Sequence, residues 1–537
     1  MKTKFTFILI LIIISFYSLN AQDKSDWKGG VPEGCTTITA GKTATVDGSV
    51  ITSHTDDSHR TRSWLDFVPA TTHKKGETVA MYKRTATDSL ITPAYKHTVI
   101  GKIPQVKKTY AYLNTAYPCI NEHQLAIGES TFGGRDELQS DKGLIDCQRL
   151  AQLLVERCTT AREAIKTAGE LTKKYGWNDA GECLTIADPN EVWHFEITGS
   201  GKGKTGAVWA AQRVPDDHIA VNANASTIKE IDLDKPDYFM ASENIYSIAE
   251  ENGWWNKGEE FVFCNVYAPE SRKSVAARRR EWRVFDLLAP SLKLNPTSEN
   301  YPFSVKPDEK VDVQAVINVF QDYYEGTPYD MTRTKTVTDD NGKQIISPLA
   351  NPFLPYDQLE VDNIRGGWFH ISDDGHSEFL GERTIARWYT MYGTIIQCRD
   401  WLPDDTGGLV WLAMDNIATS IYVPIYCGAA DIAQQYKVHG RETGFTMESA
   451  WWIFNRLGTL TAQRWGDMRH DVRGVWDPIQ TDYFKNQAEF EKKAVSIKNP
   501  EKRKEFLTKY SKSEGERIMK EAVKLGDHLW TKYDEKF

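Results

Sequence analysis

The chain has 537 residues, of which 65 are Lys or Arg and 74 are Asp or Glu, so its formal net charge is −9 at pH 7. A chain of this length can bury a large core, and its length predicts two or more structural units. The acidic balance offers no basic footprint for nucleic acid, which is therefore excluded as an expected partner.

The first 21 residues have the layout of a secretory signal peptide. Lys2 and Lys4 supply a positive start, residues 5–16 are almost wholly apolar, and Ala21 ends a plausible cleavage site. This apolar run is shorter than the roughly 20 residues that a membrane-spanning helix needs. We therefore expect a secreted or periplasmic protein that has no membrane contact once residues 1–21 are removed.

Residues 22–34 form a short polar segment in front of Cys35. The segment is too small and polar to bury a core and is interpreted as a linker or a pro-segment. Cleavage between Gly34 and Cys35 would leave 537 − 34 = 503 residues. The first residue of that chain would carry a thiol nucleophile together with a free α-amine as its base, which is a minimal device for breaking amide bonds.

A cysteine taken at random is more often an ordinary strand residue than a nucleophile. Three features favour the nucleophile at Cys35. It follows a leader and a polar segment, it is preceded by the flexible Gly34, and it is followed by a predicted hairpin that returns the chain to a polar cluster.

Periodicity and turn residues predict the elements in chain order. Two strands, residues 36–40 and 49–53, are expected to form a hairpin around Asp47-Gly48. Further strands are expected at residues 107–113, 125–128, 183–187, 191–197, 208–213 and 218–221, and helices at residues 144–159, 161–175 and 277–288. Strand pairs that alternate with helix pairs predict a layered protein with helices stacked over antiparallel sheets.

The composition changes near residue 486, where Lys, Glu and Arg become dominant. Pro500 occupies a typical first position of a helix. We interpret residues 486–537 as an extension of two amphipathic helices and residues 35–485 as the main catalytic region.

A polar cluster, Ser53-His54-Thr55-Asp56-Asp57-Ser58-His59, follows the second strand. His54, Asp56, Asp57 and His59 are possible metal ligands, but alternation along an extended chain would divide them between two faces. A carboxylate beside the Cys35 amine is a second interpretation, and a solvated loop is a third. No metal and no organic cofactor is expected.

Polar groups inside apolar strands are further candidates. Asn222 and Asn224 lie in an apolar run, where an amide is either a structural edge residue or a donor to an oxyanion. Asn224-Ala225-Ser226 also matches the glycosylation sequon. The run from Arg278 to Arg283 is either a solvated helix face or the source of one arginine that points to a thiolate or a substrate carboxylate.

Two other patterns resemble known motifs incompletely. Residues 199–205 (Gly-Ser-Gly-Lys-Gly-Lys-Thr) have the glycine one position too close for a phosphate-binding loop. Residues 128–133 (Gly-Glu-Ser-Thr-Phe-Gly) lack the final glycine of a nucleophile elbow. The eight cysteines contain no C-x-x-C pair, and their spacing does not require disulfides.

Taken together, these residues resemble peptidase family C69, the dipeptidases within the N-terminal nucleophile (Ntn) hydrolase superfamily. The opening block is the most specific part: Cys35-Thr36-Thr37-Ile38, Gly41-Lys42 and Asp47-Gly48-Ser49-Val50-Ile51. It is shared more loosely with penicillin V acylases and bile-salt hydrolases. Further matches lie at residues 121–130, 213–218, 230–233, 239–242, 278–283, 287–291, 401–403 and 422–424, so the resemblance covers about residues 35–436.

The resemblance implies an α+β fold, a four-layer αββα sandwich, and self-removal of the segment before the cysteine. It implies Cys35 as the nucleophile, Asp57 as the partner of its amine, Asn224 in the oxyanion hole and Arg280 near the thiol, with Arg279 or Arg283 as alternatives for the arginine.

Two positions depart from the family pattern. Thr131 stands where the acylases have a second oxyanion asparagine, and His54 begins the segment where many members have Arg-Asn-x-Asp. The resemblance therefore adds His54, Thr131 and Arg283 as candidate substrate-binding residues, with a possible change of specificity.

The expected function is hydrolysis of dipeptides or short peptides, with homo-oligomerisation possible. One alternative is an N-acyl amide hydrolase that uses the same site with an apolar acyl pocket. Another is a secreted binding protein without catalysis, in which some of the 17 tryptophans contact glycan or peptide.

Overall fold

A computed structural model describes residues 34–58, 60–87, 94–333, 335–353, 369–371, 377–379 and 382–536. The chain divides into two compact units. The smaller joins Met1–Pro32 and Pro355–Gly381 and contains one described antiparallel pair, β19 (Phe369–Ile371) with β20 (Ser377–Phe379). The predicted signal peptide, most of the predicted pro-segment and His59 lie outside the described residues.

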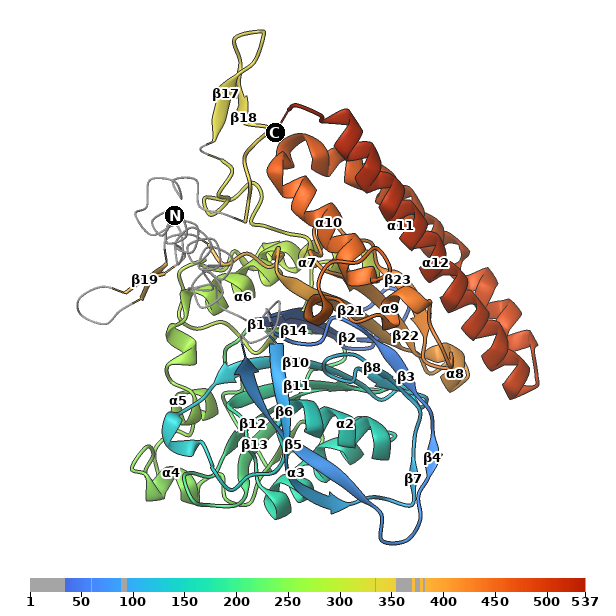
Figure 1. The fold of residues 1–537 in the computed structure, drawn as a ribbon. Helices are drawn as coiled ribbons and strands as arrows, with labels where there is room; N and C mark the ends of the chain where they lie inside the picture. The colour runs from blue at the N-terminus through green and yellow to red at the C-terminus, as the bar shows by residue number, and fades with distance from the viewer. Residues whose placement is uncertain are drawn as a thin grey trace, which may run out of the picture. The chain divides into compact units, whose positions relative to one another are not determined.

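The larger unit, Glu33–Leu354 with Glu382–Phe537, contains two large antiparallel sheets among its described residues (Figure 1). The seven-stranded sheet has the order β16 (Ser304–Val305), β14 (Ile219–Asn222), β1 (Gly34–Ala40), β2 (Val50–Asp57), β21 (Thr390–Cys398), β22 (Leu409–Met414), β23 (Val423–Tyr426). The eight-stranded sheet has the order β15 (Phe239–Ala241), β13 (Ala207–Arg213), β12 (Val192–Gly199), β11 (Gly181–Ala187), β10 (Ala126–Gly133), β9 (Ile120–Asn121), β8 (Tyr112–Asn114), β3 (Asp66–Val68).

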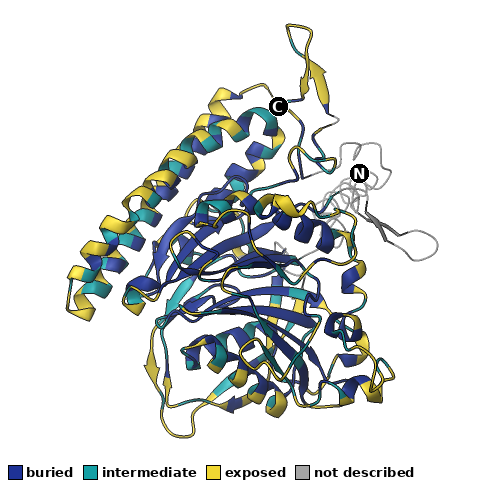
Figure 2. Cartoon of the chain, turned by 180° about the vertical axis from the view of Figure 1, so that it is seen from behind, coloured by how far each residue is buried: buried dark blue, intermediate teal, exposed yellow. Residues whose placement is uncertain are grey.

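The two sheets pack face to face through β1 and β2 on one side and β10 and β11 on the other. Gly128 shows how closely they approach. A Cβ on this residue would lie 2.5 Å from Thr185 Oγ1 and closer still to the carbonyl oxygen of Ser53. Both faces of these strands are therefore buried (Figure 2), which explains why β1, β2, β11 and β12 are buried along almost their whole length rather than at alternate residues.

Helices cover the outer faces of both sheets in this unit. On the eight-stranded sheet lie α2 (Cys147–Arg157) and α3 (Ala161–Tyr175), which are capped by Asp146 and Thr160. On the seven-stranded sheet lie α6 (Val275–Leu288), α7 (Val313–Phe320), α10 (Ala450–Gln463) and α12 (Pro500–Lys532). The remaining helices are α4 (Ser247–Glu251), α5 (Phe263–Tyr267), α8 (Asp404–Gly407), α9 (Gln434–Lys437) and α11 (Trp465–Ser496).

Smaller strand pairs complete the unit: β4 (Thr71–Thr72) with β7 (Lys108–Thr109), β5 (Thr78–Thr87) with β6 (Ala94–Pro104), and β17 (Thr336–Thr338) with β18 (Gln344–Ile346).

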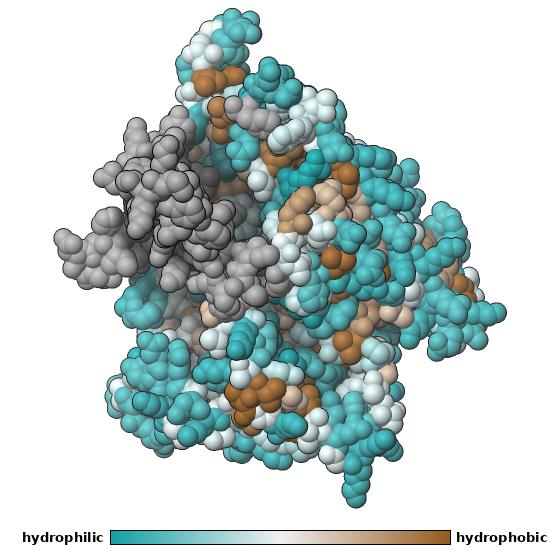
Figure 3. Space-filling view, viewed as in Figure 1, coloured by the Kyte–Doolittle hydropathy of each residue, from teal (hydrophilic) through white to brown (hydrophobic). Residues whose placement is uncertain are grey.

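On the face shown in Figure 3, the coloured side chains are mostly hydrophilic, and the hydrophobic ones lie in small separate groups. All eight cysteines are buried and unpaired. No helix in the described ranges has the length and apolar character needed to cross a bilayer.

The mixed α and β structure predicted from the sequence is confirmed, with three differences in detail. The hairpin expected around Asp47-Gly48 is confirmed, since β1 and β2 pair antiparallel, but its connection spans residues 41–49, in which Gly48 has φ +84°. The strand expected at residues 107–113 is two strands, β7 and β8, in different sheets. At the C-terminus, Pro500 begins α12 as expected, while α11 runs without interruption across the proposed boundary at residue 486.

Candidate active site

Cys35 is the second residue of β1 and lies between the two sheets. It pairs with Asp56 of β2 in the strand register and is 5% exposed. The peptide bond to Gly34 is intact in this chain, and the N–H of Cys35 donates to Asn224 Oδ1 at 3.0 Å. The thiol lies 3.2 Å from Glu129 Oε2 on β10. The nucleophile predicted from the sequence is therefore surrounded by polar groups from both sheets.

Asn224 follows β14 in the left-handed backbone conformation, with φ +67°. Asparagine accepts this conformation more readily than most residues. Its N–H donates to Ser130 Oγ at 3.0 Å, and its Nδ2 donates to the carbonyl of Thr131 at 2.7 Å. One side-chain amide thus joins the start of β1 to the end of β10.

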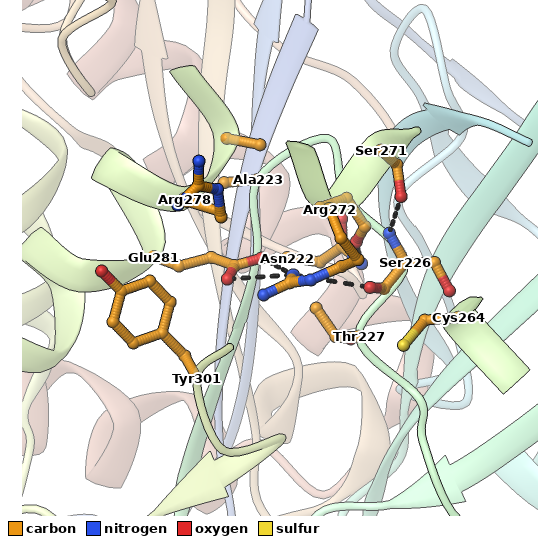
Figure 4. Close-up of polar contacts among 12 residues, drawn as sticks. Asn222, Ala223, Ser226, Thr227, Cys264, Ser271, Arg272, Arg278, Glu281 and Tyr301 are labelled. Carbon is orange, nitrogen blue, oxygen red and sulfur yellow. Dashed lines mark hydrogen bonds and ion pairs between the residues drawn. The ribbon is translucent and has the colours of Figure 1, made fainter. Parts of the chain in front are cut away.

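The segment after Asn224 is fixed by a buried ion pair behind it (Figure 4). Arg272 donates to both carboxylate oxygens of Glu281, at 2.8 and 3.1 Å, and reaches the carbonyl of Ser226 at 3.5 Å. The N–H of Ser226 donates to Ser271 Oγ at 3.1 Å. Asn222, the other candidate amide, donates to the carbonyl of Ala225 at 2.9 Å, which makes it a support of this segment.

Arg280 of α6 is the arginine that contacts Cys35. One terminal nitrogen donates to the carbonyl of Cys35 at 2.8 Å and lies 3.0 Å from Thr36 Oγ1. The other donates to Asn224 Oδ1 at 2.8 Å and to the carbonyl of Ala223 at 2.9 Å. Burial and the nearby charge of Arg383 lower the pKa of Arg280 to about 9. Arg280 therefore holds both the backbone of Cys35 and the amide of Asn224.

The other two arginines proposed for this role lie elsewhere. Arg279 contacts Glu382 at 3.3 Å and covers the ring of Tyr329. Arg283 forms a two-pronged ion pair with Asp322, at 2.9 and 2.8 Å, and a further one with Asp286 at 2.7 Å. The contacts of Arg283 are those of a structural ion pair, and they do not bring it to Cys35 as a substrate-binding residue.

Asp57 lies opposite Gly34 in the register of β1 and β2. Its carboxylate accepts from Arg383 at 2.5 Å and from Thr390 Oγ1 at 2.6 Å. The expected hydrogen bond between Asp57 and the nitrogen of Cys35 does not occur in this uncleaved chain, because Asn224 accepts from that nitrogen instead. Burial alone would lower the pKa of the Arg383 guanidinium. The negative charge of Asp57 opposes this effect of burial, and the pKa is raised overall.

A cluster of acidic side chains lies beside the thiol. Glu129 of β10 and Glu182 of β11 are 0% and 1% exposed. The hydroxyl of Thr131 lies between them, 3.1 Å from Glu129 Oε1 and 2.9 Å from Glu182 Oε1. His54 Nε2 is 3.3 Å from Glu129 Oε2. Thus His54 and Thr131, both expected at the site, contact the same carboxylate that the thiol contacts.

These contacts divide the charge between the two acids. Burial alone would raise the pKa of Glu129, but hydrogen bonds from His54 and Glu182 and the charge of His54 bring this pKa down to about 2. Burial, followed by the charges of Glu129 and Asp179, raises the pKa of Glu182 well above its ordinary value. Ionisation is therefore favoured at Glu129 and opposed at Glu182.

The pKa of the Cys35 thiol is raised, whereas an activated thiol nucleophile has a lowered pKa. Burial raises the pKa of Cys35 well above its ordinary value, and the charges of Glu129, Asp56 and Asp57 raise it further. Asp56 itself has a pKa raised by burial to about 7, and its carboxylate accepts from Thr61 Oγ1 at 2.6 Å. In the uncleaved chain the thiol is therefore held protonated.

The side chains that could bind a cation in this region are not the set that the sequence indicated. Of the possible ligands in the polar cluster, Asp57 and Asp56 are already engaged by Arg383 and Thr61. Among the residues that the structure describes, the groups of possible ligands with atoms within 4.8 Å of one another are Cys35, His54 and Glu129, and also Glu129, Cys147 and Glu182. Both groups include Glu129.

Sequence reasoning missed Glu129, Glu182 and Arg383. The signal for the two acids was weak, since Glu129 follows the strand predicted at residues 125–128 and Glu182 precedes the one predicted at residues 183–187. The strand register explains why the two acids lie close together. Thr131, two residues after Glu129 on β10, lies opposite Glu182 on β11. Arg383 is 326 positions from Asp57, and no local pattern marks it.

The comparisons with known proteins identify a family. The sequence model of peptidase family C69 matches residues 34–477, so the match begins one residue before Cys35. A probable dipeptidase from Latilactobacillus sakei is 26% identical over 440 residues, which is 80% of this chain and 82% of that protein. A probable dipeptidase from Salmonella dublin is 24% identical over 419 residues (73% and 81%). Dipeptidase A from Lactobacillus helveticus is 20% identical over 447 residues (82% and 83%).

A family match over most of the chain is sufficient for assignment. The protein belongs to peptidase family C69 and is a peptidase, a hydrolase of peptide bonds.

Proposed function

We propose that this protein is an exported cysteine dipeptidase whose nucleophile is Cys35, freed as the N-terminal residue by self-cleavage after Gly34. The observation that carries the proposal is the environment of Cys35. Its thiol, its N–H and its carbonyl each contact a different side chain, namely Glu129, Asn224 and Arg280. The names of the relatives, dipeptidases and probable dipeptidases, support dipeptides as the substrate class.

Self-cleavage begins with attack of the Cys35 thiol on the carbonyl carbon of Gly34. A C–S bond forms, the C–N bond between Gly34 and Cys35 breaks, and the thiol proton moves to the departing nitrogen. Water then hydrolyses the thioester, which leaves a carboxylate on Gly34 and restores the thiol. The products are the released segment and a chain that begins with a free α-amine at Cys35.

In the mature enzyme the α-amine of Cys35 accepts the thiol proton, directly or through water. The unperturbed pKa of an α-amine is about 7.7–8.0, so this group acts as a base near neutral pH. The thiolate attacks the substrate carbonyl, the leaving amine takes the proton, and water hydrolyses the acyl-enzyme. This chemistry needs no group beyond those that the chain supplies.

Asn224 is the proposed side-chain donor to the oxyanion. Its Nδ2 carries two hydrogens, and one of them is used by the carbonyl of Thr131. Arg280 fixes the amide by donating to its oxygen, so the nitrogen is oriented away from that contact. Removal of one oxyanion donor typically costs about 3 kcal/mol of transition-state stabilisation.

We further propose that the two packed sheets and their covering helices are the αββα sandwich of Ntn hydrolases. The order helix, sheet, sheet, helix in the larger unit supports this, as does the position of the nucleophile at the start of a central strand. Export is proposed from the signal-like residues 1–21, whose removal would precede cleavage after Gly34.

The test combines the mass of the mature protein with a substrate panel. Full-length protein is expected to mature to a chain that begins at Cys35 and to hydrolyse dipeptides. Cys35→Ser is expected to keep the preceding segment or to lose activity, whereas Cys183→Ser, at another fully buried cysteine, keeps processing intact. Dipeptide hydrolysis at the normal rate by Cys35→Ser would falsify the assignment. Penicillin V and bile-salt conjugates in the same panel identify an acylase.

A further inference from the structure

Glu129 and Glu182 are buried carboxyls that lack a strong cationic partner. Among the described residues, the only basic side chain in an ion pair with either of them is His54, at 3.3 Å from Glu129. Glu182 Oε2 is buried and accepts no hydrogen bond from the part of the chain that the structure describes. Ionisation is favoured at Glu129 rather than at Glu182. A buried negative charge with only one basic neighbour is costly, and its place beside the thiol indicates a ligand that supplies further positive charge.

The distance from the thiol to Glu129 matches the dimensions of a peptide's first residue. A sulfur in attack position is about 3–3.5 Å from the carbonyl carbon. The α-nitrogen of the same residue is about 2.5 Å from that carbon, as bond lengths and the N–Cα–C angle require. A charge-assisted hydrogen bond from this nitrogen reaches a carboxylate about 2.7–2.9 Å away. Glu129 Oε2, at 3.2 Å from the sulfur, lies within this reach.

We propose that Glu129, supported by Glu182 through the hydroxyl of Thr131, binds the α-ammonium group of the peptide substrate, so that the enzyme requires a free amino terminus and cleaves after the first residue. This inference rests on the proposed role of Cys35 as the nucleophile. It assigns to the site a substrate-reading residue that lies on a different sheet from Cys35.

Electrostatics link binding of the ammonium group to activation of the thiol. A thiolate at 3.2 Å from an ionised Glu129 is repelled by it, and this repulsion contributes to the raised pKa of Cys35. An ammonium group at Glu129 cancels that repulsion. A substrate with a free amino terminus therefore promotes the ionisation of the nucleophile that attacks it. The charged and titratable groups around the thiol that determine the balance are Glu129, Glu182, His54, Asp56, Asp57, Arg280 and Arg383.

An N-acylated substrate cannot provide this compensation. Its amide nitrogen carries no charge, so Glu129 would lose water without gaining an ion pair. Sites that hydrogen-bond a polar substrate group reject the analogue that lacks it by factors of about 10⁴ or more, because the buried protein group is left unpaired. The arrangement therefore favours a dipeptidase over an N-acyl amide hydrolase.

The first experiment uses the wild-type enzyme and two substrates of almost equal size, alanyl-alanine and propionyl-alanine, which lacks only the α-amino group. Hydrolysis of propionyl-alanine is expected to be slower by a factor on the order of 10⁴ in kcat/KM. Rates for the two substrates within tenfold of each other would overturn the proposal. This comparison needs no variant, so its outcome does not depend on the folding of one.

The second experiment compares Glu129→Gln with the matched control Glu250→Gln, at an exposed residue of α4. Glu129→Gln is expected to reduce kcat/KM for alanyl-alanine about 100-fold and to narrow the preference for alanyl-alanine over propionyl-alanine. Iodoacetamide is expected to label Cys35 in this variant at least as fast as in the wild type, because a neighbouring negative charge is gone. A merely structural role would lower all three rates together, which would overturn the inference.

These results separate the inference from the proposed function. If Cys35→Ser is inactive but Glu129→Gln keeps the full preference for the free amine, Cys35 is the nucleophile and Glu129 does not bind the ammonium group of the substrate.

Activity that is unchanged after treatment with EDTA is expected, since the cation at Glu129 is the ammonium group of the substrate. A loss of activity that added Zn²⁺ restores would instead identify a metal ion at Glu129 and overturn the inference.

Discussion

The side-chain amide of Asn224 occupies the space in which a side chain on Gly34 would begin. A Cβ on residue 34 would lie 3.0 Å from Asn224 Cγ and would overlap sterically with its Oδ1, so one of the two groups would have to move. The amide cannot move aside freely, because Cys35, Arg280 and Thr131 all hold it. Residue 34 is thus restricted to glycine by the same group that is proposed to stabilise the oxyanion.

Gly34→Ala is therefore expected to impair processing, because its methyl group displaces the amide of Asn224 from the scissile bond. We expect precursor to accumulate, with maturation slowed on the order of 100-fold, as for loss of an oxyanion donor. Intact mass measured over time after synthesis checks this. The matched control is Gly474→Ala in α11, where an added Cβ meets nothing within 4 Å. Maturation of Gly34→Ala at the normal rate would contradict this, because it would show that the Asn224 amide can move aside without impairing processing.

Arg280→Lys is expected to lose activity about 100-fold although its formal charge is retained. A lysine cannot reproduce the planar set of contacts to Cys35, Asn224 and Ala223. Loss of these buried bonds is also expected to lower the free energy of unfolding by about 3 kcal/mol. Measurements of kcat/KM and of urea unfolding test both effects.

Arg278→Lys on the same helix is the control for Arg280→Lys. Arg278 donates to the carbonyls of Thr297 and Ser298, at 3.3 and 2.7 Å, and not to the site. It is expected to retain wild-type activity. Equal losses in the two variants would mean that the helix as a whole, rather than the guanidinium of Arg280, supports catalysis.

Asp57→Asn is expected to destabilise the protein by about 3–5 kcal/mol, because it leaves Arg383 as a buried cation without its partner. The double variant Asp57→Asn with Arg383→Met removes both charges and is expected to recover most of that loss. Chemical unfolding of the single and double variants tests the ion pair. A double variant that is stable yet inactive would support the additional role of Asp57 at the amine of mature Cys35.

A pH-dependent contribution to stability is expected from Asp415, which is remote from the thiol. Burial raises the pKa of Asp415 to about 7 from its ordinary 3.8. The folded state binds this proton more tightly than the unfolded state does. The contribution of Asp415 to stability therefore falls as the pH rises from about 4 to about 7 and is constant above that range.

Asp415→Asn removes this titration and keeps the acceptor that Asn455 Nδ2 uses at 2.9 Å. Relative to the wild type, the variant is expected to gain up to about 4 kcal/mol in unfolding free energy between pH 4 and pH 8. Urea unfolding at several pH values measures the difference. Asp340→Asn, at an exposed residue, serves as the control and is expected to show no such trend. A difference between Asp415→Asn and wild type that is independent of pH would contradict a raised pKa.

The sequence determined the local elements and the identity of the residues at the start of β1. Periodicity placed α3 at Ala161–Tyr175 and found most of β11 and β12, because these patterns depend on neighbours a few positions apart. Family resemblance indicated Cys35, Asn224 and Arg280, and the structure brings these three together. It left open which of three arginines lies nearest the thiol, since adjacent helical positions point in different directions.

Only the tertiary structure decided which charges are buried together. Glu129 and Glu182 belong to the eight-stranded sheet, whereas Cys35 and His54 belong to the seven-stranded one, and only the packing of the two sheets makes them neighbours. The same packing removes water, and this loss of solvation raises the pKa of the Cys35 thiol and that of Glu182. A sequence specifies residue types and local periodicity, but desolvation and charge pairing are properties of groups that meet from distant parts of the chain.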